Sequence, residues 1–394
     1  MNSFQKEFIT LIYAALSGEE QSISDSFDYS AGLDLAEKHS ITALFCRGAE
    51  LCHVAVPGQM IAKVSEDYCK AFIASEKQLR QLEVLFAAFE QNQIQYLPLK
   101  GTVLKPMYPS AELRSMGDAD ILIRLEQYPA IAEILTQLGY TFQKETGHEL
   151  IWKKGVLLLE LHKHIMTQEN RDYYRYFGQG WERAVQRPES SRFVFSNEDF
   201  YIYVFAHLTK HYRISGIGIK HLLDIWVCRQ SFSDLDMDYV EQELRKMKLE
   251  EFHSNVIRTL DMWFRGTEPD YRTELVSETV FSSGEYGTHE MSNINHILRD
   301  TAVSNSVAQS KFKRSWKIMF LPYGLMCRRY NWLKKLPFLL PIAWIIRLFD
   351  ILFFKRKELK KYRGNLKKIN QDTLNAHSLA LAAVGIGFHF EETA

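Results

Sequence analysis

Cysteine is scarce in this sequence, and its placement excludes the usual cysteine-based scaffolds. The chain of 394 residues has five cysteines, which are scattered, odd in number and without a pair at CxxC spacing: Cys46, Cys52, Cys69, Cys228 and Cys327. A disulfide framework and a structural zinc site both require cysteines in regular, closer sets. We therefore expect a protein of the reducing cytoplasm, stabilised by its hydrophobic core.

The sequence also lacks a secretion signal and a long, uninterrupted apolar run. Its N-terminal apolar run, Phe8 to Leu16, follows Lys6 and Glu7 rather than a basic region, so we interpret it as the first helix. The most apolar run, Leu336 to Phe354, is interrupted by two prolines and two charged residues. A membrane-spanning helix needs about 20 mostly apolar residues, so this run indicates an interfacial segment rather than a span.

The chain has no net charge, but its charges are unevenly distributed. Residues 311–368 contain 17 lysines and arginines against two acidic residues, whereas the rest of the chain is acidic. Such a basic segment predicts an anionic partner, and we expect a membrane surface, with nucleic acid less favoured. The alternative is that its apolar residues pack on the rest of the protein and its lysines form a solvated rim. We expect a cytoplasmic protein, peripheral at the inner face of the membrane if the first interpretation holds.

The order of predicted elements places the chain in the α+β class. Residues 1–92 have the i, i+3, i+4 apolar spacing of helices, and residues 93–190 mix short strands with short helices. Residues 191–300 return to helical spacing, with one long helix predicted from Tyr239 to Arg265, and residues 301–394 form the basic tail. No repeat or low-complexity segment separates these four regions.

Two aspartates stand close together in the stretch Leu97 to Arg124. Asp118 and Asp120 are two positions apart in a predicted strand, so both carboxylates lie on one face while Ala119 and Ile121 turn to the other. Mg²⁺ prefers hard oxygen ligands and is usually held by one or two carboxylates together with substrate phosphates. The pattern therefore predicts a magnesium site. The alternative is a pair of solvated carboxylates at a strand end.

A third carboxylate follows in a predicted hairpin. Glu149 to Lys153 and Val156 to His162 flank the turn residues Lys154-Gly155, and Glu160 interrupts an otherwise apolar face of the second arm. Glu160 is therefore a candidate third metal ligand, although a carboxylate at the wet end of a strand has the same pattern. His162 shares this face, where a structural histidine is the commoner interpretation.

The start of the stretch Leu97 to Arg124 favours phosphate binding. Gly101 and Thr102 follow a predicted strand, Ile94 to Leu99, and open a helix, whose free N–H groups attract phosphate. The nearby cations Lys100, Lys105 and Arg114 are candidate ligands of triphosphate oxygens, arginine through its bidentate fork. The alternatives are an ordinary turn before a helix and unpaired surface charges.

Together these motifs resemble the nucleotidyltransferase superfamily of the DNA polymerase β type. Its pattern is a hydrophobic residue, then Gly, then Gly or Ser, and about ten or more residues later Asp-hydrophobic-Asp or Glu. The segments LKGTVL, YPSAELRSMGDADILI and LELH are similar to uncharacterised bacterial nucleotidyltransferases with a "KG…L…Y…R…D-D-L" core. The resemblance extends from about residue 8 to about residue 265, and departs from the pattern at Thr102, where Ser is commoner, and in a slightly long spacing to Asp118.

The resemblance implies a polymerase β-like core, a small mixed sheet with helices, flanked by N-terminal and C-terminal helical regions. It also implies Mg²⁺-dependent transfer of a nucleoside monophosphate from a nucleoside triphosphate such as ATP to an acceptor hydroxyl or phosphate, with release of pyrophosphate. Two Mg²⁺ ions, or Mn²⁺, would be held by Asp118, Asp120 and Glu160. The acceptor, whether small molecule, sugar or protein, cannot be deduced from these motifs.

A non-catalytic protein that binds nucleotide or docks to a membrane on the same fold is the main alternative, because a fold does not fix a function. A degenerate member of the superfamily is expected to lack at least one of the three carboxylates, and here all three are present. The histidines His207, His211 and His221 resemble a metal-ligand cluster only superficially, since no Glu follows His207 as in a metalloprotease. Asp224 falls where the helical domain of the related proteins presents a polar residue to the cleft, but we interpret it as a carboxylate on a helix surface.

Overall fold

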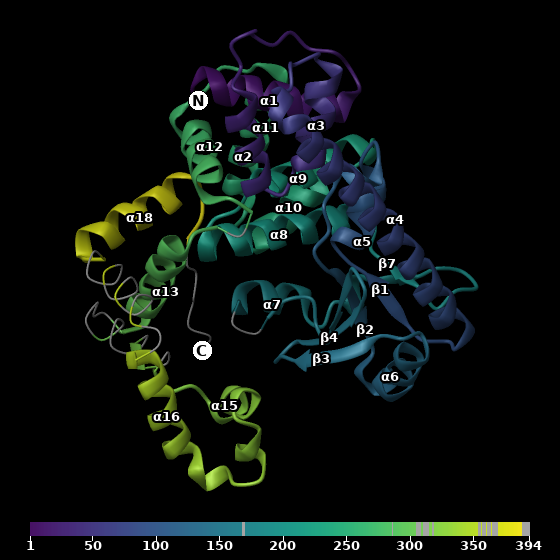
Figure 1. The fold of residues 1–394 in the computed structure, drawn as a ribbon, viewed down its shortest axis with the longest axis vertical. Coiled ribbons are helices and arrows are strands. Elements are labelled where there is room, and N and C mark those ends of the chain that lie inside the picture. The colour runs from purple at the N-terminus through teal and green to yellow at the C-terminus, as the bar shows by residue number, and fades with distance from the viewer. Residues whose placement is uncertain are drawn as a thin grey trace. The chain divides into compact units, whose positions relative to one another are not determined.

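The computed structural model describes residues 1–167, 170–285, 287–304, 309, 315–316, 319–353, 356, 360, 364 and 369–387. Contacts group the chain into two compact units (Figure 1). Unit 1 comprises residues 1–212, 217–286 and 384–394, and unit 2 comprises residues 213–216 and 287–383. The predicted α+β class is confirmed, because helices surround one five-stranded mixed sheet in unit 1. The four-region division of the sequence stays a prediction.

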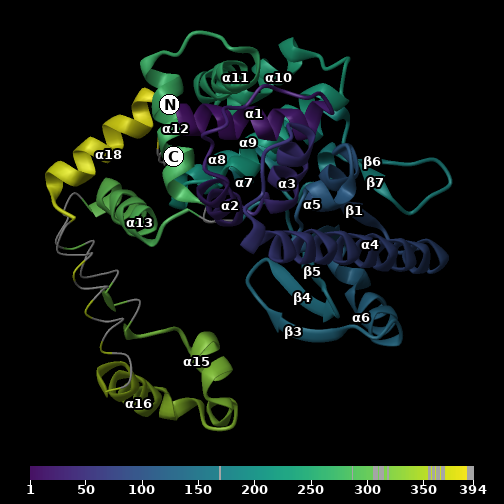
Figure 2. The same cartoon turned by 45° about the horizontal axis from the view of Figure 1, so that its top comes forward.

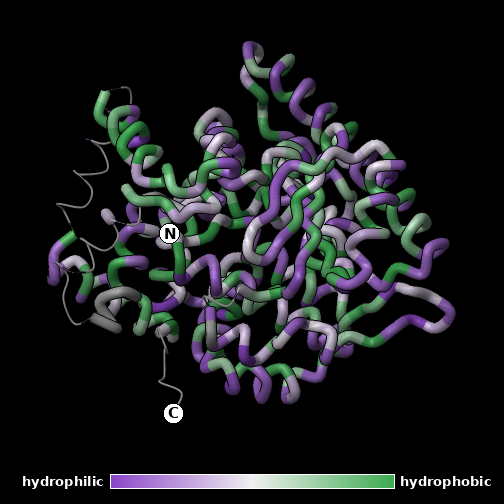
Figure 3. Tube along the Cα trace, turned by 90° about the horizontal axis from the view of Figure 1, so that it is seen from below, coloured by the Kyte–Doolittle hydropathy of each residue, from purple (hydrophilic) through white to green (hydrophobic). Residues whose placement is uncertain are grey.

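The N-terminal residues are helical, as predicted. They form α1 (Ser3–Ser17), α2 (Tyr29–Lys38), α3 (Thr42–Leu51), the 3-10 turn η1 (Gly58–Met60) and α4 (Ile61–Gln91). Asn2 and Gln5 form a capping box that starts α1, and the rings of Phe8 and Phe45 stack between α1 and α3. Hydrophobic stretches of the trace alternate with hydrophilic ones in Figure 3, as expected for helices with one buried face.

The sheet has the strand order β1-β2-β5-β4-β3. Its strands are β1 (Tyr96–Pro98), β2 (Ala119–Ile123), β3 (Thr141–Glu145), β4 (Glu149–Lys154) and β5 (Leu157–His162). Strand β2 pairs with β5 in parallel, and the other pairs are antiparallel. The predicted β4–β5 hairpin is confirmed. Strand β3 was not predicted, because all its residues are exposed at the sheet edge and show no apolar alternation.

One face of the sheet packs into a hydrophobic core. Ala119, Ile121 and Ile123 of β2 pack with leucines of β5 against α4 and α6 (Tyr128–Gln137). Because side chains alternate along a strand, Asp120 of β2 and Glu160 of β5 lie on the opposite face. The connection from β1 to β2 contains α5 (Gly101–Leu104), η2 (Lys105–Met107) and η3 (Ala111–Leu113), and η4 (Leu125–Gln127) precedes α6.

Helices return after a short segment with α7 (Arg171–Phe177), η5 (Trp181–Arg183), β6 (Val185–Gln186) and β7 (Phe193–Val194). They are α8 (Asn197–Ser215), α9 (Ile219–Ser231), α10 (Met237–Lys246), α11 (Glu250–Arg265) and α12 (Tyr271–Ser283). The predicted single helix from Tyr239 to Arg265 is wrong. The chain breaks between α10 and α11 at Lys248, which has φ 55° and lies between the buried residues Met247 and Leu249.

Unit 2 is helical in the part that the structure describes. It contains α13 (His289–Ser304), α15 (Tyr323–Arg329), η6 (Asn331–Lys334), η7 (Pro337–Leu339), α16 (Leu340–Phe353) and α18 (Gln371–Ala383), which Figure 2 shows from a second direction. Its buried residues form two small clusters, one around Ile297 and Leu374 and one around Met326 and Leu333. Among the described residues, no helix is long and apolar enough to cross a bilayer.

Candidate active site

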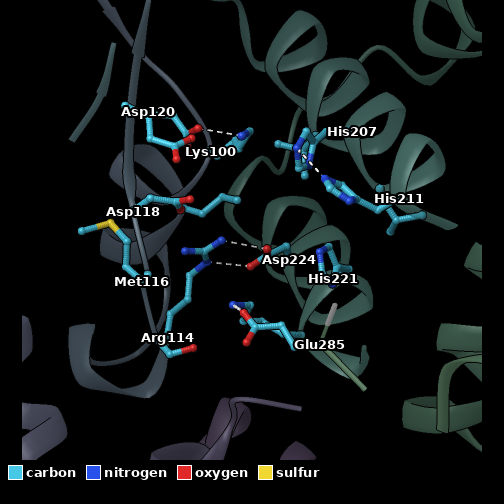
Figure 4. Close-up of a pocket in the computed structure, with 18 of the residues that line it drawn as sticks. Lys100, Arg114, Met116, Asp118, Asp120, His207, His211, His221, Asp224 and Glu285 are labelled. Atoms are coloured by element: carbon cyan, nitrogen blue, oxygen red, sulfur yellow. Dashed lines mark hydrogen bonds and ion pairs between the residues drawn. The ribbon is translucent and has the colours of Figure 1, made fainter. Parts of the chain in front are cut away.

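The three predicted carboxylates lie on one face of the sheet, at the floor of a cleft of about 240 Å³. Asp120 and Glu160 are register partners in the parallel β2–β5 pair, and Asp118 immediately precedes β2. Figure 4 shows Asp118 and Asp120 across the cleft from His207 and His211 of α8. Ligand atoms of Asp120, Glu160 and His162 lie within 4.8 Å of one another. Residues 40 positions apart are thus brought together by strand pairing alone.

Asp120 is buried and has two partners on one oxygen. Its Oδ1 lies 2.6 Å from Lys100 Nζ and 2.7 Å from His162 Nε2. Burial opposes ionisation of Asp120, but the Lys100 ammonium and the His162 hydrogen bond outweigh it and hold its pKa well below the usual range. Burial lowers the pKa of His162, so a neutral ring donates Nε2–H to the carboxylate. Asp120 is therefore ionised, and its orientation is fixed.

The pKa values of Asp118 and Glu160 are raised, in contrast to that of Asp120. Burial and the neighbouring Asp120 raise the pKa of Asp118, and burial together with Asp118, Glu149 and Asp120 raises the pKa of Glu160 to about 8. Carboxylates that repel one another at short range favour a bound cation. The donor set of the three carboxylates consists of oxygen atoms, which is chemistry that suits Mg²⁺ or Mn²⁺. The residues therefore fit the divalent metal that their pattern predicts.

Lys100 and Gly101 line the same cleft. Lys100 has φ 41°, a left-handed conformation that costs a lysine of order 1 kcal/mol or more and that directs its ammonium to Asp120. Gly101 allows a close approach, because a Cβ atom there would lie 3.0 Å from Arg114 Nη1 and 3.0 Å from Met116 Cγ. The helix that Gly101 opens, α5, has only four residues, so its dipole contributes little.

Two of the predicted nucleotide ligands lie outside the cleft lining. Thr102 Oγ1 donates to the carbonyl oxygen of Leu99 at 2.5 Å, which closes the turn before α5. Lys105 is 2 % exposed, and its Nζ donates to the carbonyl oxygen of Arg114 at 2.7 Å. Both side chains support the loop between β1 and β2.

Arg114 lines the cleft, but its guanidinium is occupied by Asp224 of α9. Arg114 Nε lies 2.7 Å from Asp224 Oδ1 and Nη2 lies 2.9 Å from Oδ2, and the hydroxyl of Tyr108 donates to Oδ1 at 2.9 Å. The interpretation of Asp224 as a helix-surface carboxylate is wrong, because it is 5 % exposed. The sequence around Asp224 does not indicate that its partner is Arg114, which lies 110 residues earlier in the chain. The pair ties the β1–β2 loop to α9.

The helical wall of the cleft contributes residues that were not predicted as ligands. His207, Lys210 and His211 lie on one face of α8, at i, i+3 and i+4, and His221 follows on α9. His207 Nε2 and His211 Nε2 are 3.1 Å apart, and burial lowers the pKa of both rings, which are neutral. The i, i+3, i+4 spacing of these polar residues on a largely apolar helix is the sequence pattern that could have predicted a polar wall of the cleft.

Lys210 differs from the other cations of the cleft because it has no hydrogen-bond or ion-pair partner among the described residues. Lys100 is paired with Asp120, Arg114 with Asp224 and Lys220 with Glu285. Burial, reinforced by the charge of Lys100, lowers the pKa of Lys210 to about 8. The ammonium is therefore mostly charged at neutral pH and faces the carboxylate floor without a direct partner.

Comparison with known proteins relates the chain to one family. A profile of the family described as uncharacterised nucleotidyltransferase matches residues 25–265. A solution structure of the antibiotic-resistance factor ANT(2'')-Ia is similar, with 12% identity and a TM-score of 0.33, over 49% of this chain and 100% of that chain. A crystal structure of ANT(2")-Ia with adenylyl-2"-tobramycin is similar at 14% identity and a TM-score of 0.33, over 43% and 97% of the two chains. Comparison with curated proteins gave no match. Because the family profile spans more than half of the chain, this protein belongs to the uncharacterised nucleotidyltransferase family and is a nucleotidyltransferase.

Proposed function

We propose that the protein transfers a nucleoside monophosphate from a nucleoside triphosphate to an acceptor hydroxyl or phosphate, with Asp118, Asp120 and Glu160 as the ligands of divalent metal. The observation that carries this proposal is the convergence of the three carboxylates on the cleft face of two parallel strands. The acceptor oxygen bonds to the α-phosphorus, the bond from that phosphorus to the bridging oxygen breaks, and pyrophosphate leaves. A proton of the acceptor hydroxyl passes to solvent or to Glu160.

The residues of the cleft divide this work. The three carboxylates hold Mg²⁺, which, when bound, neutralises the triphosphate and lowers the pKa of the acceptor hydroxyl. His162 holds Asp120 in its ionised, fixed orientation. Lys210, which has no partner in the protein among the described residues, binds triphosphate oxygens. Gly101 allows the Arg114 and Met116 side chains to lie close to the backbone at the edge of the cleft.

Lys100 is proposed to act as a counterion before metal binds. Its ammonium lies 2.6 Å from Asp120 Oδ1, and a divalent metal would be held by the same carboxylate, so the two cations would compete for it. A displaced Lys100 is free to contact a phosphate.

We also propose that the nucleotide is ATP, that two Mg²⁺ ions bind, and that the protein is cytoplasmic. The proposed acceptor is a small molecule, a sugar or a protein. The aminoglycoside in the comparison structure is an acceptor class to test here, beside sugars and proteins. A contact of residues 311–368 with an anionic membrane rests on a different part of the chain and has its own experiment.

Isotope position tests the reaction type. Purified protein is incubated with a small-molecule extract and ATP labelled at either the α- or the γ-phosphate, with Mg²⁺ or with EDTA. We expect a product labelled only from α-labelled ATP, only with Mg²⁺, and absent with Asp118→Asn/Asp120→Asn protein whose circular dichroism is unchanged. A product labelled from γ-labelled ATP would instead indicate phosphoryl transfer, and equal labelling by the double variant would remove the aspartates from the reaction.

A further inference from the structure

Helix α16 and the turn before it expose an unusual set of large apolar side chains. Between Leu336 and Phe353, eight of them are 40 to 73 % exposed: Leu336, Phe338, Ile342, Ile345, Ile346, Phe349, Leu352 and Phe353. Single exposed apolar residues are common, but a contiguous set on one helix marks a surface that binds something. The six residues within α16 recur at i, i+3, i+4 and i+7 and so form one stripe. We call this set the α16 apolar face.

The other side of α16 is already packed and contains its charged residues. Ala343 is fully buried, and Trp344 Nε1 donates to the carbonyl oxygen of Leu321 at 2.8 Å. Arg347 Nη1 donates to the carbonyl oxygen of Met319 at 3.0 Å, and Asp350 accepts from Arg329 at 3.1 Å. Helices of soluble proteins normally turn their apolar side inward. In α16 the two charged residues have partners away from the apolar stripe, Arg347 on Met319 and the half-exposed Asp350 on Arg329, and the apolar stripe points out.

The charge around this stripe favours an anionic surface. Lys334 and Lys335 are exposed directly before it, next to the exposed Leu336 and Phe338. Residues 311–368 contain 17 basic residues and two acidic ones, of which Asp350 is paired with Arg329. A groove on a protein partner would need only the apolar stripe, whereas an acidic lipid surface matches both the stripe and the exposed Lys334 and Lys335 beside it.

The dimensions of α16 favour the membrane surface over its interior. The 14 residues of α16 that the structure describes span about 21 Å at 1.5 Å per residue, whereas the hydrocarbon core is about 30 Å thick. We propose that the α16 apolar face inserts into the headgroup boundary of an anionic bilayer and attaches the enzyme to it reversibly. This proposal does not depend on the chemistry of the cleft.

Flotation of the full-length protein tests the proposal. The probes are vesicles of phosphatidylcholine alone and vesicles with 30% phosphatidylglycerol, at 20 mM and 500 mM NaCl. We expect flotation with the anionic vesicles at low salt, at least tenfold less at high salt, and little with neutral vesicles. Each lysine near the surface contributes roughly fivefold, so Lys334→Gln/Lys335→Gln should reduce partitioning roughly 25-fold at low salt.

A pair of matched variants separates the apolar face from general exposure. Ile345→Asp/Phe349→Asp changes two outward side chains of α16 and should reduce partitioning at least tenfold, with circular dichroism unchanged. The control, Phe72→Asp/Ile73→Asp, changes two residues of α4 with similar exposure, 47 % and 50 %, and should float like the wild type. The proposal is overturned if wild-type protein does not float with anionic vesicles at low salt, or if both variants behave alike. It is also overturned if light scattering shows that Ile345→Asp/Phe349→Asp only converts a dimer to a monomer.

Discussion

Removal of the Asp224 carboxylate is expected to destabilise unit 1 strongly. The Arg114 and Asp224 side chains are each 7% exposed and share two hydrogen bonds of 2.7 and 2.9 Å. Asp224→Asn keeps the shape of the side chain but leaves the guanidinium as a buried charge without its counterion, which typically costs about 3–5 kcal/mol. Arg114 connects the β1–β2 loop to α9, so the loss of stability should affect the elements that form the cleft.

Native-state hydrogen exchange measures this loss locally, which matters in a chain of two units. We expect peptides from α9 and from residues 113–123 to exchange at least a hundredfold faster in Asp224→Asn than in the wild type, since 1.4 kcal/mol corresponds to a factor of ten. In Arg114→Met/Asp224→Asn the unpaired charge is gone and Tyr108 keeps an acceptor, so most of the protection should return. A loss below about 1 kcal/mol in the single variant, or a double variant worse than the single one, would refute the assignment.

Within the cleft, Lys210→Met should weaken binding of α,β-methylene-ATP with Ca²⁺ at least tenfold by calorimetry, whereas Lys210→Arg should retain it. Because the pKa of Lys210 is about 8, the affinity of the wild type for the nucleotide should fall as the pH rises through 8 and the ammonium is lost. Lys210→Arg should abolish this pH dependence. A wild-type affinity that is the same at all pH values would exclude the contact between Lys210 and the triphosphate. Gly101→Ala should reduce nucleotide affinity at least tenfold in a folded protein, because its Cβ displaces Met116; unchanged affinity would mean that the neighbours yield cheaply. Lys100→Met should lower the Tm of the metal-free protein, because Asp120 loses its counterion. Millimolar Mg²⁺ should then raise the Tm of the variant more than that of the wild type. Identical shifts of Tm by Mg²⁺ in the two proteins would contradict the counterion role of Lys100.

The carboxylate floor was readable from the sequence because strand periodicity is local information. Alternation alone places Asp118 and Asp120 on one face, and the apolar pattern of the hairpin isolates Glu160. That β5 pairs directly with β2, which sets Asp120 opposite Glu160, is a long-range fact that only the family resemblance implied. The hairpin, the N-terminal helices and the α+β class follow from the same local patterns.

The helical wall of the cleft could not be predicted from the sequence, because its contacts join residues that are far apart in the chain. The partner of Arg114 lies 110 residues later, and no local pattern distinguishes Asp224 from a solvated carboxylate. Lys105 has the same charge as Lys210, yet one supports a loop and the other faces the cleft. The break at Lys248 was missed because buried Met247 and Leu249 continue the helical spacing across it.

The central claim is that Asp118, Asp120 and Glu160 hold divalent metal against a nucleoside triphosphate. A crystal soaked with α,β-methylene-ATP and Mn²⁺, with anomalous scattering to locate the metal, tests it most directly. We expect manganese between these carboxylates, triphosphate oxygens near Lys210, and Lys100 Nζ displaced from its 2.6 Å contact with Asp120. Nucleotide bound elsewhere, or bound in the cleft with Lys100 still on Asp120 and no manganese peak, would contradict it.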